Sequence, residues 1–261
     1  MYFEFQSDIT FTSAVTGWRK MKFKYVTLTD KGLKRTDNED AFGVFDVEDG
    51  LLVLVCDGLG GNKAGDIASR LAVQTISKTF TKLKGIEYLE RIRLSILEAN
   101  KTVVDESNKD FDRKGMATTV EALFLKDDNA YWGHVGDSRI YYLRNNKLKQ
   151  LSKDHSLVQK LIDEGYLTLK EAENHPNKNI IMRALGDSNS LDVDLSKLKI
   201  NSNDSSKFFV CTDGVTTVLN DNDLEKLLVN KNIHYTSEMI ANLVDKRGAP
   251  DNYTFVIIAK N

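Results

Sequence analysis

The sequence has few of the features that make a chain disordered, disulfide-bonded or membrane-embedded. It contains only two prolines and two cysteines in 261 residues, and it has no low-complexity tract. Its longest apolar runs, at residues 51–56 and 253–259, are far shorter than the roughly 20 residues that a transmembrane helix needs. The first 20 residues lack the basic start and the continuous apolar middle of a signal peptide. We therefore expect neither a membrane anchor nor a secreted protein.

An excess of positive charge is also missing. The chain has 36 Lys and Arg against 38 Asp and Glu, which gives a formal net charge of −2. Nucleic acids and anionic lipids usually require a concentrated basic surface, so we expect neither as a partner. Cys56 and Cys211 lie inside apolar runs without the spacing of zinc ligands, which predicts buried free thiols and fits a reducing cytoplasm.

The residues that are present form a series of short apolar and β-branched runs, typical of strands. These runs are Phe23–Thr29, Ala41–Val47, Leu51–Cys56, Thr118–Leu125, Ala130–Val135, Ile140–Leu143, Lys207–Cys211 and Tyr253–Ala259. Turn pairs that suit β-hairpins join several of them, at Asp49-Gly50, Asp128-Asn129 and Asn145-Asn146, so the sheets should be largely antiparallel.

Apolar residues with helical spacing occur at 67–83 and 86–103, which predicts two long helices over one sheet face. Shorter helices are expected near 156–164, 221–229 and 237–244, the last two over the other face. The sequence therefore predicts a layered α/β fold, an α-β-β-α sandwich of two largely antiparallel sheets flanked by helices.

We expect residues 21–261 to form one domain, because no internal repeat or linker divides them. Residues 1–20 are expected to be an extension, whose role the sequence leaves open. Between about residues 152 and 185 the pattern becomes short, polar and weakly periodic, which is typical of a mobile insert over a sheet edge.

Acidic residues recur at the ends of the predicted strands. An Asp-Gly pair follows a buried run at Asp57 and again at Asp213, while Asp40 and Asp251 each precede a strand-like run. In an antiparallel sheet the start of one strand lies beside the end of its neighbour, so a turn at residues 48–50 brings Asp40 near Asp57. If the other pair meets in the same way, four aspartates gather at one rim.

Four clustered carboxylates would repel one another and resist burial unless cations neutralised them. Hard oxygen ligands favour Mg²⁺ or Mn²⁺ over zinc, so the pattern predicts a two-metal site. An isolated Asp-Gly pair commonly marks only a turn. After Asp57, however, glycines at 58, 60 and 61 would weaken the fold unless close backbone approach is needed, and the carbonyl of Gly58 could then face a cation.

Seven short blocks carry these residues in a fixed order. They are Arg35–Asp40, Val55–Gly61 with Gly65, Ala117–Thr119, Gly136–Arg139, Asp154–Ser156, Cys211–Gly214 and Asp251–Asn252. Each block is weak alone, but the ordered set resembles the PPM family, the metal-dependent type 2C protein phosphatases, and particularly its compact bacterial members. The resemblance extends from about Lys24 to Lys260.

The resemblance implies two metal sites. Asp57 would bridge them, with a carbonyl ligand from Gly58. The remaining ligands would divide between the ions: Glu39 and Asp40 on one side, partly through waters, and Asp213 with Asp251 on the other. A water or hydroxide bridging the two Mn²⁺ or Mg²⁺ ions would attack phosphorus in line, without a phosphoenzyme. The implied function is hydrolysis of phosphoserine and phosphothreonine in phosphoprotein substrates, in signalling with a cognate Ser/Thr kinase.

Three further expectations follow from the resemblance. Arg35 would grip the phosphate oxygens with its fork of donors, the alternative being a solvated ion pair with the acidic run beside it. Asp137 looks like the ligand that bacterial relatives use with Asp213 for a weaker third metal, the alternative being a turn residue. Residues 152–185 resemble the variable flap that would touch the substrate protein.

The proton donor for the leaving group is left open. Leu59 stands where many eukaryotic relatives carry a histidine that is a candidate general acid. For His134, His155, His175 and His234 we expect packing or surface roles, and for the Asp154-His-Ser156 block the start of a helix.

Two other functions remain as alternatives. A two-metal phosphodiesterase or nuclease also clusters aspartates around divalent cations, although the absent basic tract argues against it. A pseudophosphatase would keep the fold as a silent phosphoprotein-binding module after losing metal ligands, but every expected ligand is present here.

Overall fold

A computed structural model describes residues 23–48, 50–60, 64–188, 190–200 and 206–260. The predicted extension at residues 1–20, Asp49 of the first turn pair, and Gly61 of the glycine-rich block lie outside these ranges. None of the helices in the described ranges is long and apolar enough to cross a membrane.

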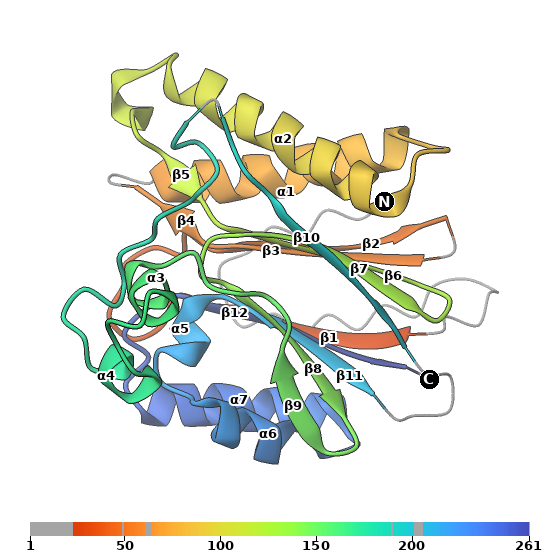
Figure 1. Cartoon of the computed structure of the whole chain (residues 1–261), viewed down its shortest axis with the longest axis vertical. Helices are drawn as coiled ribbons and strands as arrows, with labels where there is room; N and C mark the ends of the chain where they lie inside the picture. Colours follow the sequence, from red (N-terminus) through yellow and green to blue (C-terminus); the bar gives the residue numbers. More distant parts are fainter. Residues whose placement is uncertain (1–22, 49, 61–63, 189, 201–205, 261) are drawn as a thin grey trace.

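Two five-stranded antiparallel sheets form the centre of the structure (Figure 1). The first has the order β1 (Phe23–Asp30), β12 (Tyr253–Lys260), β11 (Lys207–Cys211), β8 (Arg139–Arg144), β9 (Lys147–Gln150). The second has the order β10 (Asp194–Lys199), β7 (Asn129–Val135), β6 (Val120–Lys126), β3 (Gly50–Cys56), β2 (Ala41–Val47). A small third sheet pairs β4 (Gly58–Leu59) with β5 (Ala117–Thr118) at one end of the sandwich.

Helices cover the outer faces of both sheets. In Figure 1, α1 (Ala64–Lys82) and α2 (Tyr88–Ser107) lie over the second sheet, and α6 (Asp221–Leu228) and α7 (Ile233–Lys246) lie over the first. The shorter elements are η1 (Phe111–Arg113), α3 (Leu157–Asp163), α4 (Leu169–Glu173) and α5 (Asp213–Thr216). The predicted α-β-β-α sandwich is therefore confirmed.

The alternation of side chains along β3 explains how the layers hold together. Leu52 and Leu54 pack toward α1 and α2, whereas Val53 and Val55 pack into the core between the two sheets. Because successive side chains of a strand point to opposite faces, a strand that is covered on both faces appears in the sequence as a continuous apolar run. Cys56 at its end is a buried free thiol, as predicted, and so is Cys211.

Several predicted boundaries are corrected by the strand register. Val47 pairs with Gly50, so Gly50 belongs to β3 and not to the first hairpin turn. Lys126 pairs with Asn129, so the second hairpin loop is at residues 127–128, one residue earlier than predicted. The Asn145-Asn146 loop is as predicted, with φ of +50° and +60° at its two residues, the values that a tight hairpin turn requires.

Two strands of the five-stranded sheets, β9 and β10, were not predicted from the sequence. β9 and β10 are edge strands, and both are rich in lysine and largely exposed. Lysine on an edge strand discourages pairing with other chains, but it also removes the apolar alternation by which a strand is recognised.

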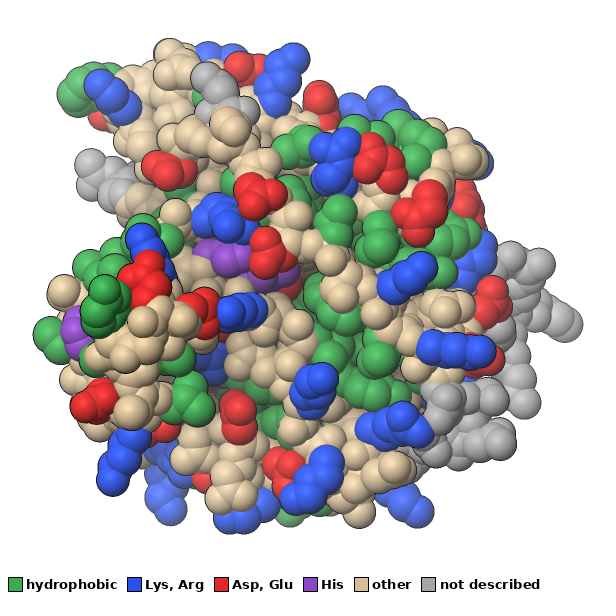
Figure 2. Space-filling model, in the orientation of Figure 1, with side chains coloured by type: hydrophobic (Ala, Val, Ile, Leu, Met, Phe, Trp, Pro, Cys, Tyr) green, Lys and Arg blue, Asp and Glu red, His purple; other side chains and the backbone are tan. Residues whose placement is uncertain are grey.

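On the face shown in Figure 2, acidic and basic side chains are interspersed.

Candidate metal centre

The predicted meeting of Asp40 and Asp57 is confirmed in the second sheet. Ala41 pairs with Cys56 at the end of the β2–β3 ladder. Asp40 and Asp57 are the next residues along these two neighbouring segments. The N–H of Gly58 then donates to the carbonyl of Glu39 at 3.1 Å, which continues the pairing past the end of the strands.

Asp213 and Asp251 are brought together in the same way, but in the first sheet. β11 and β12 pair as far as Cys211 and Phe255, and the N–H of Thr212 then donates to the carbonyl of Thr254 at 3.0 Å, so the two segments remain side by side. A Cβ atom on Gly214 would lie 1.9 Å from the carbonyl oxygen of Asn252, so only glycine allows the start of α5 to pass this close. Asp213 is the first residue of α5, beside Asp251.

Direct contacts join the two pairs across the end of the sandwich. The hydroxyl of Thr212 donates to Oδ2 of Asp40 at 2.9 Å, which links the first sheet to the second. The charge of Asp213 raises the pKa of Asp57, because these two carboxylates lie close together. The four aspartates therefore come from two different sheets and converge at one rim.

Burial and mutual repulsion shift the protonation of this cluster. Burial, together with the charges of Asp213 and Asp251, raises the pKa of Asp40 to about 7. Burial and the charge of Asp251 raise the pKa of Asp213 to about 6. For Asp57, burial and the charges of Asp40 and Asp213 raise the pKa well above its usual range. The cluster therefore needs protons or cations to balance its charge.

Asp137 belongs to the same electrostatic cluster. It lies between β7 and β8, and burial and the charge of Asp213 raise its pKa to about 8. Ser138, the next residue, has its hydroxyl 2.8 Å from that of Thr119. Thr119 in turn accepts a hydrogen bond from the N–H of Asp57 at 2.9 Å. A hydroxyl pair thus connects the Asp137 turn to Asp57.

The donor set fits hard divalent cations. Oδ1 of Asp40 and Oδ1 of Asp137 are buried and accept no hydrogen bond from any described residue. A buried carboxylate oxygen without a partner is costly, and a cation of the Mg²⁺ or Mn²⁺ type would satisfy it. Within the described part of the chain, no three Asp, Glu, His or Cys side chains are already arranged as a closed ligand set. Asp40 accepts a hydrogen bond from Thr212, and Asp251 accepts one from Arg35.

The glycines around Asp57 allow a close backbone approach, as predicted. A Cβ atom on Gly58 would lie 2.3 Å from the carbonyl oxygen of Gly65 and 2.5 Å from that of Glu39. Gly65, in the first turn of α1, would place its own Cβ 2.9 Å from the carboxyl carbon of Glu39. Burial raises the pKa of Glu39, although Arg35 opposes this shift. The start of α1 thus packs directly against the Glu39 and Gly58 backbones.

Asn252 supports the site through hydrogen bonds, a role that was not predicted from the sequence. Its Nδ2 donates to the carbonyl oxygens of Lys31 and Asp37, at 2.9 and 2.8 Å, and its Oδ1 accepts from the N–H of Glu39 at 2.9 Å. It therefore holds the loop that carries Arg35 to the rim. Its position in an Asp-Asn pair before a strand was the available signal.

Arg35 lies at the rim, where it forms an ion pair. Its Nη2 donates to Oδ2 of Asp251 at 2.8 Å, and its side chain is 53% exposed. The acidic partner is not one of the residues that follow it in the sequence, as the alternative interpretation expected, but a predicted metal ligand from the far end of the chain.

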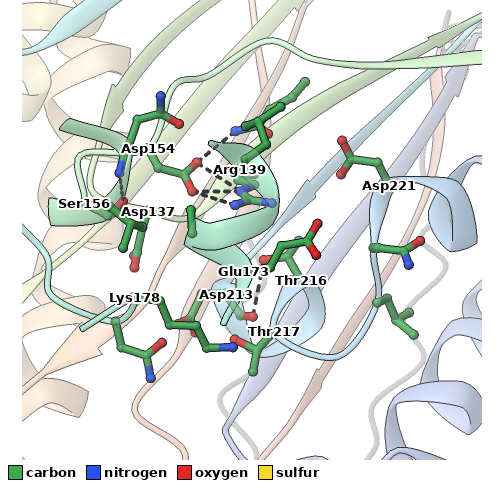
Figure 3. Close-up of a pocket in the computed structure, with 18 of the residues that line it drawn as sticks. Asp137, Arg139, Asp154, Ser156, Glu173, Lys178, Asp213, Thr216, Thr217 and Asp221 are labelled. Atoms are coloured by element: carbon green, nitrogen blue, oxygen red, sulfur yellow. Dashed lines mark hydrogen bonds and ion pairs between the residues drawn. The ribbon is translucent and has the colours of Figure 1, made fainter. Parts of the chain in front are cut away.

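A pocket of about 660 Å³ opens beside Asp137 and Asp213. Figure 3 shows it between the predicted flap, which supplies Ser156, Glu173 and Lys178, and the segment from α5 to the start of α6, with Asp221. Arg139 lines the same pocket and donates to both carboxylate oxygens of Asp154 (Figure 3). Ser156 caps α3 by accepting from the N–H of Gln159, so the expected helix start is confirmed.

Comparisons with known proteins identify the family of the chain. The profile of the family described as protein phosphatase 2C matches residues 33–250. The serine/threonine phosphatase stp of Listeria welshimeri is 36% identical over 239 residues, which is 89% of this chain and 94% of that protein.

Solved structures show the same fold. The Mycobacterium tuberculosis serine/threonine phosphatase PstP/Ppp has a TM-score of 0.85 at 28% identity, covering 92% of this chain and 99% of that chain. The catalytic domain of the phosphatase PstP, solved in complex with 2 manganese ions, has a TM-score of 0.81 at 28% identity, with 91% and 97% covered. From its sequence and its fold alike, the chain belongs to the protein phosphatase 2C family.

Proposed function

We propose that this protein is a metal-dependent phosphatase that hydrolyses phosphoserine and phosphothreonine in protein substrates. Membership of the protein phosphatase 2C family supports the reaction class. The observation that carries the proposal is the convergence of aspartates from both sheets on one rim, where Asp40 and Asp137 each have a buried carboxylate oxygen without a described partner. Such a rim suits divalent cations and the phosphate that they would bind.

Two Mn²⁺ or Mg²⁺ ions are the proposed cofactors. Asp57 and the carbonyl of Gly58 would hold them together with the side chains of Glu39, Asp40, Asp213 and Asp251. When bound, the ions would supply a water of lowered pKa for in-line attack on phosphorus and would neutralise charge on the phosphoryl group. The relative solved with 2 manganese ions supports this number.

The chain's own residues position these ligands and the substrate. Thr212 orients Asp40 through its hydroxyl, and Asn252 holds the Arg35–Asp40 loop against β12. Arg35 is proposed to bind two phosphate oxygens, because its guanidinium is at the rim, mostly exposed, and presents two parallel donors.

The pocket next to the rim is the proposed place for the substrate polypeptide. Asp137 and Asp213 line both this pocket and the proposed metal centre. A substrate polypeptide could therefore lie in the pocket while its phosphorylated side chain reaches the metals. The flap side of the pocket is mixed: Val158, Ile162 and Leu169 are apolar and lie among polar residues such as Ser156 and Lys178. Leu169 is 72% exposed. We propose that residues 152–185 act as a flap that contacts residues flanking the phosphorylated side chain.

A third, weaker cation is proposed at Asp137, with Asp213. Two observations support this site. Oδ1 of Asp137 is buried and has no described hydrogen-bond partner, and the charge of nearby Asp213 raises the pKa of Asp137. Leu59, in β4, has no proton to give, so the leaving group needs another source.

The wider setting is proposed from the same reaction class. A protein phosphatase of this kind would oppose a cognate Ser/Thr kinase, and two buried free thiols fit a reducing cytoplasm. Residues 21–261 would form the phosphatase domain, with residues 1–20 as an extension.

One assay tests the proposal against its alternatives. Phosphate release is measured with and without Mn²⁺ on a phosphothreonine peptide, a phosphotyrosine peptide and a phosphodiester. Metal-dependent turnover of the phosphothreonine peptide is the expected result. Preferred turnover of the diester would indicate a phosphodiesterase, and peptide binding without turnover would indicate a pseudophosphatase.

A further inference from the structure

One histidine contacts both polar backbone groups of the residue that precedes Asp137. The Nδ1 atom of His155 lies 3.1 Å from the backbone nitrogen of Gly136, and the N–H of His155 donates to the Gly136 carbonyl at 2.7 Å. We propose that His155 is a positioning residue that fixes the Gly136–Asp137 turn and thereby the direction of the Asp137 carboxylate. The inference rests on the metal-binding role proposed for Asp137.

The hydrogen bonds determine which tautomer His155 must have. A backbone N–H can only donate, so Nδ1 must carry a lone pair toward Gly136. The ring proton is then on Nε2, which lies 3.3 Å from Oδ2 of Asp194. Nη1 of Arg183 is near the same nitrogen but has its own acceptor, Oδ1 of Asp194, at 2.8 Å. Burial and neighbouring His134 lower the pKa of His155 to about 4, which keeps the ring neutral at pH 7.

The ring of His134 packs against the ring of His155 and restricts its position. The rings of His134 and His155 are 4.4 Å apart, at an angle of 39°. Nε2 of His134 must donate to the carbonyl of Lys153, at 2.8 Å, and its Nδ1 lies 2.7 Å from Oε1 of Glu121. Glu121 and His134 are paired across β6 and β7 and are almost completely buried. His155 therefore lies against a surface that belongs to the sheet.

The other side of the turn is held by Thr119. Gly136 has φ of +116°, and a Cβ atom there would lie 2.5 Å from Cγ2 of Thr119. Ser138 contacts the same threonine through its hydroxyl. The turn is thus clamped between Thr119 and His155. Because Oδ1 of Asp137 accepts no hydrogen bond from the described residues, its direction depends on this backbone.

His155 also lies where the two ends of the predicted flap meet. It is near the start of the insert, and its carbonyl accepts from the N–H of Met182, near the end, at 2.7 Å. His155 therefore links the Gly136–Asp137 turn to both ends of the flap, where the flap joins the rest of the domain. On the face shown in Figure 2, histidine side chains are visible at the floor of a recess between acidic and basic side chains.

Two substitutions separate the hydrogen bond from the volume of the side chain. In His155→Asn the amide oxygen can take the place of Nδ1 and accept from Gly136, whereas His155→Leu has similar bulk and no acceptor. His234→Leu is the matched control, because His234 is exposed on α7, away from the site. Thermal unfolding confirms that each variant folds.

Three readouts are measured on the full chain. Amide hydrogen exchange at Gly136, followed by NMR without metal, reports the hydrogen bond directly and should accelerate about tenfold or more in His155→Leu. Calorimetric titration with Mn²⁺ should show the weak site lost and the two tight sites kept. On a phosphothreonine peptide, kcat should fall about tenfold with little change in KM. His155→Asn should recover most of each effect, and His234→Leu should match the wild type.

Equal behaviour of His155→Asn and His155→Leu in exchange and kcat would overturn the inference, since packing alone would then explain the residue. Unchanged Gly136 exchange in a folded His155→Leu would overturn it as well. A wild type that binds Mn²⁺ but releases no phosphate would contradict the proposed function instead, while the exchange and titration experiments would still decide the role of His155.

Discussion

Arg35 donates a hydrogen bond to Asp251 across 216 residues of sequence, from Nη2 to Oδ2 at 2.8 Å. The two side chains have different proposed tasks, since Arg35 would bind phosphate and Asp251 a cation. Both are partly exposed, at 53% and 34%, and an exposed ion pair contributes little to stability. The ion pair therefore keeps both side chains at the rim. Because it contributes little stability, it can break at low cost when Arg35 binds phosphate and Asp251 binds a cation.

Substitution of Arg35 should weaken substrate binding more than it slows chemistry. Arg35→Ala removes two charge-assisted hydrogen bonds that would be made in both the ground state and the transition state, so KM should rise about tenfold or more while kcat changes less. Steady-state kinetics with a phosphothreonine peptide measure this, with Lys34→Ala as the control from the same exposed loop. Unchanged KM and unchanged inhibition by product phosphate would leave Arg35 as an ion-pair residue only.

Removal of the cations should abolish activity, and so should removal of a central carboxylate. Treatment with a chelator, Asp57→Asn or Asp213→Asn should each eliminate phosphate release, because the site then has neither its nucleophile nor its charge balance. Full activity in a chelated sample that metal analysis shows to be metal-free would disprove the two-metal mechanism.

The same Asp213→Asn variant should be more stable than the wild type when both are metal-free. The substitution removes one of several buried carboxylates that repel one another. Relief of about 1 kcal/mol corresponds to a rise in Tm of about 2–4 °C for a chain of this size. Asp105→Asn, at an exposed position of α2, is the control. A lower Tm for Asp213→Asn at pH 8 would contradict strong repulsion in the cluster.

The strand ends could be predicted from the sequence because two local signals agree there. Each Asp-Gly pair follows an apolar run, and antiparallel pairing places the start of the neighbouring strand beside it. The register of β2 and β3 confirms this for Asp40 and Asp57. The sequence does not show, however, that the second pair comes from the other sheet, because sheet membership depends on contacts between distant segments.

The supporting residues could not be predicted, because their partners are far away in the sequence. Thr212 reaches Asp40 over 172 residues, and Asn252 reaches Glu39 over 213. A threonine or an asparagine beside an aspartate has many ordinary uses, so the residue type alone does not indicate such a contact. His155 was likewise expected to have only a packing or surface role, because its contacts with Gly136 cannot be read from the residue type.

The buried Glu121–His134 pair should make stability depend on pH. Burial raises the pKa of Glu121 from 4.5 to about 6, and although burial lowers the pKa of His134, the charge and hydrogen bond of Glu121 raise it above 6.5 overall. Groups with a raised pKa in the folded state hold their protons more tightly than in the unfolded state. Their stabilisation is therefore complete below the unfolded values and is lost as pH rises through the folded ones.

The Glu121 contribution is lost between about pH 4.5 and pH 6. Above about pH 6.5 we expect the free energy of unfolding of the wild type to keep falling, by at most about 1.4 kcal/mol per pH unit, because of His134. Glu121→Gln should flatten that part of the curve, because neutral His134 can accept from the amide without an extra proton. Denaturant unfolding at saturating Mn²⁺ removes the contribution of the rim carboxylates. Parallel curves for the two proteins between pH 6.5 and pH 9 would refute the expected linkage.

The last prediction concerns Asp137, which is near the rim but outside the pairs formed by the strand ends. A cation held by few protein carboxylates keeps more of its water, binds weakly, and could help to protonate a leaving group where Leu59 cannot. Asp137→Ala should therefore keep the two tight sites in a calorimetric titration and lose the weak one. Its kcat on a phosphothreonine peptide should fall about tenfold or more, because an alkoxide leaving group needs a proton.

A substrate with a nitrophenolate leaving group separates this effect from general damage to the site. Nitrophenolate is stable without a proton, so Asp137→Ala should lose much less activity on nitrophenyl phosphate than on the peptide. Asp137→Asn, which keeps the shape of the side chain without its charge, should behave like Asp137→Ala if the cation is the cause. If Asp137→Asn retains the wild-type rate on the peptide, or if both substrates are affected equally by Asp137→Ala, the residue only shapes the turn between β7 and β8.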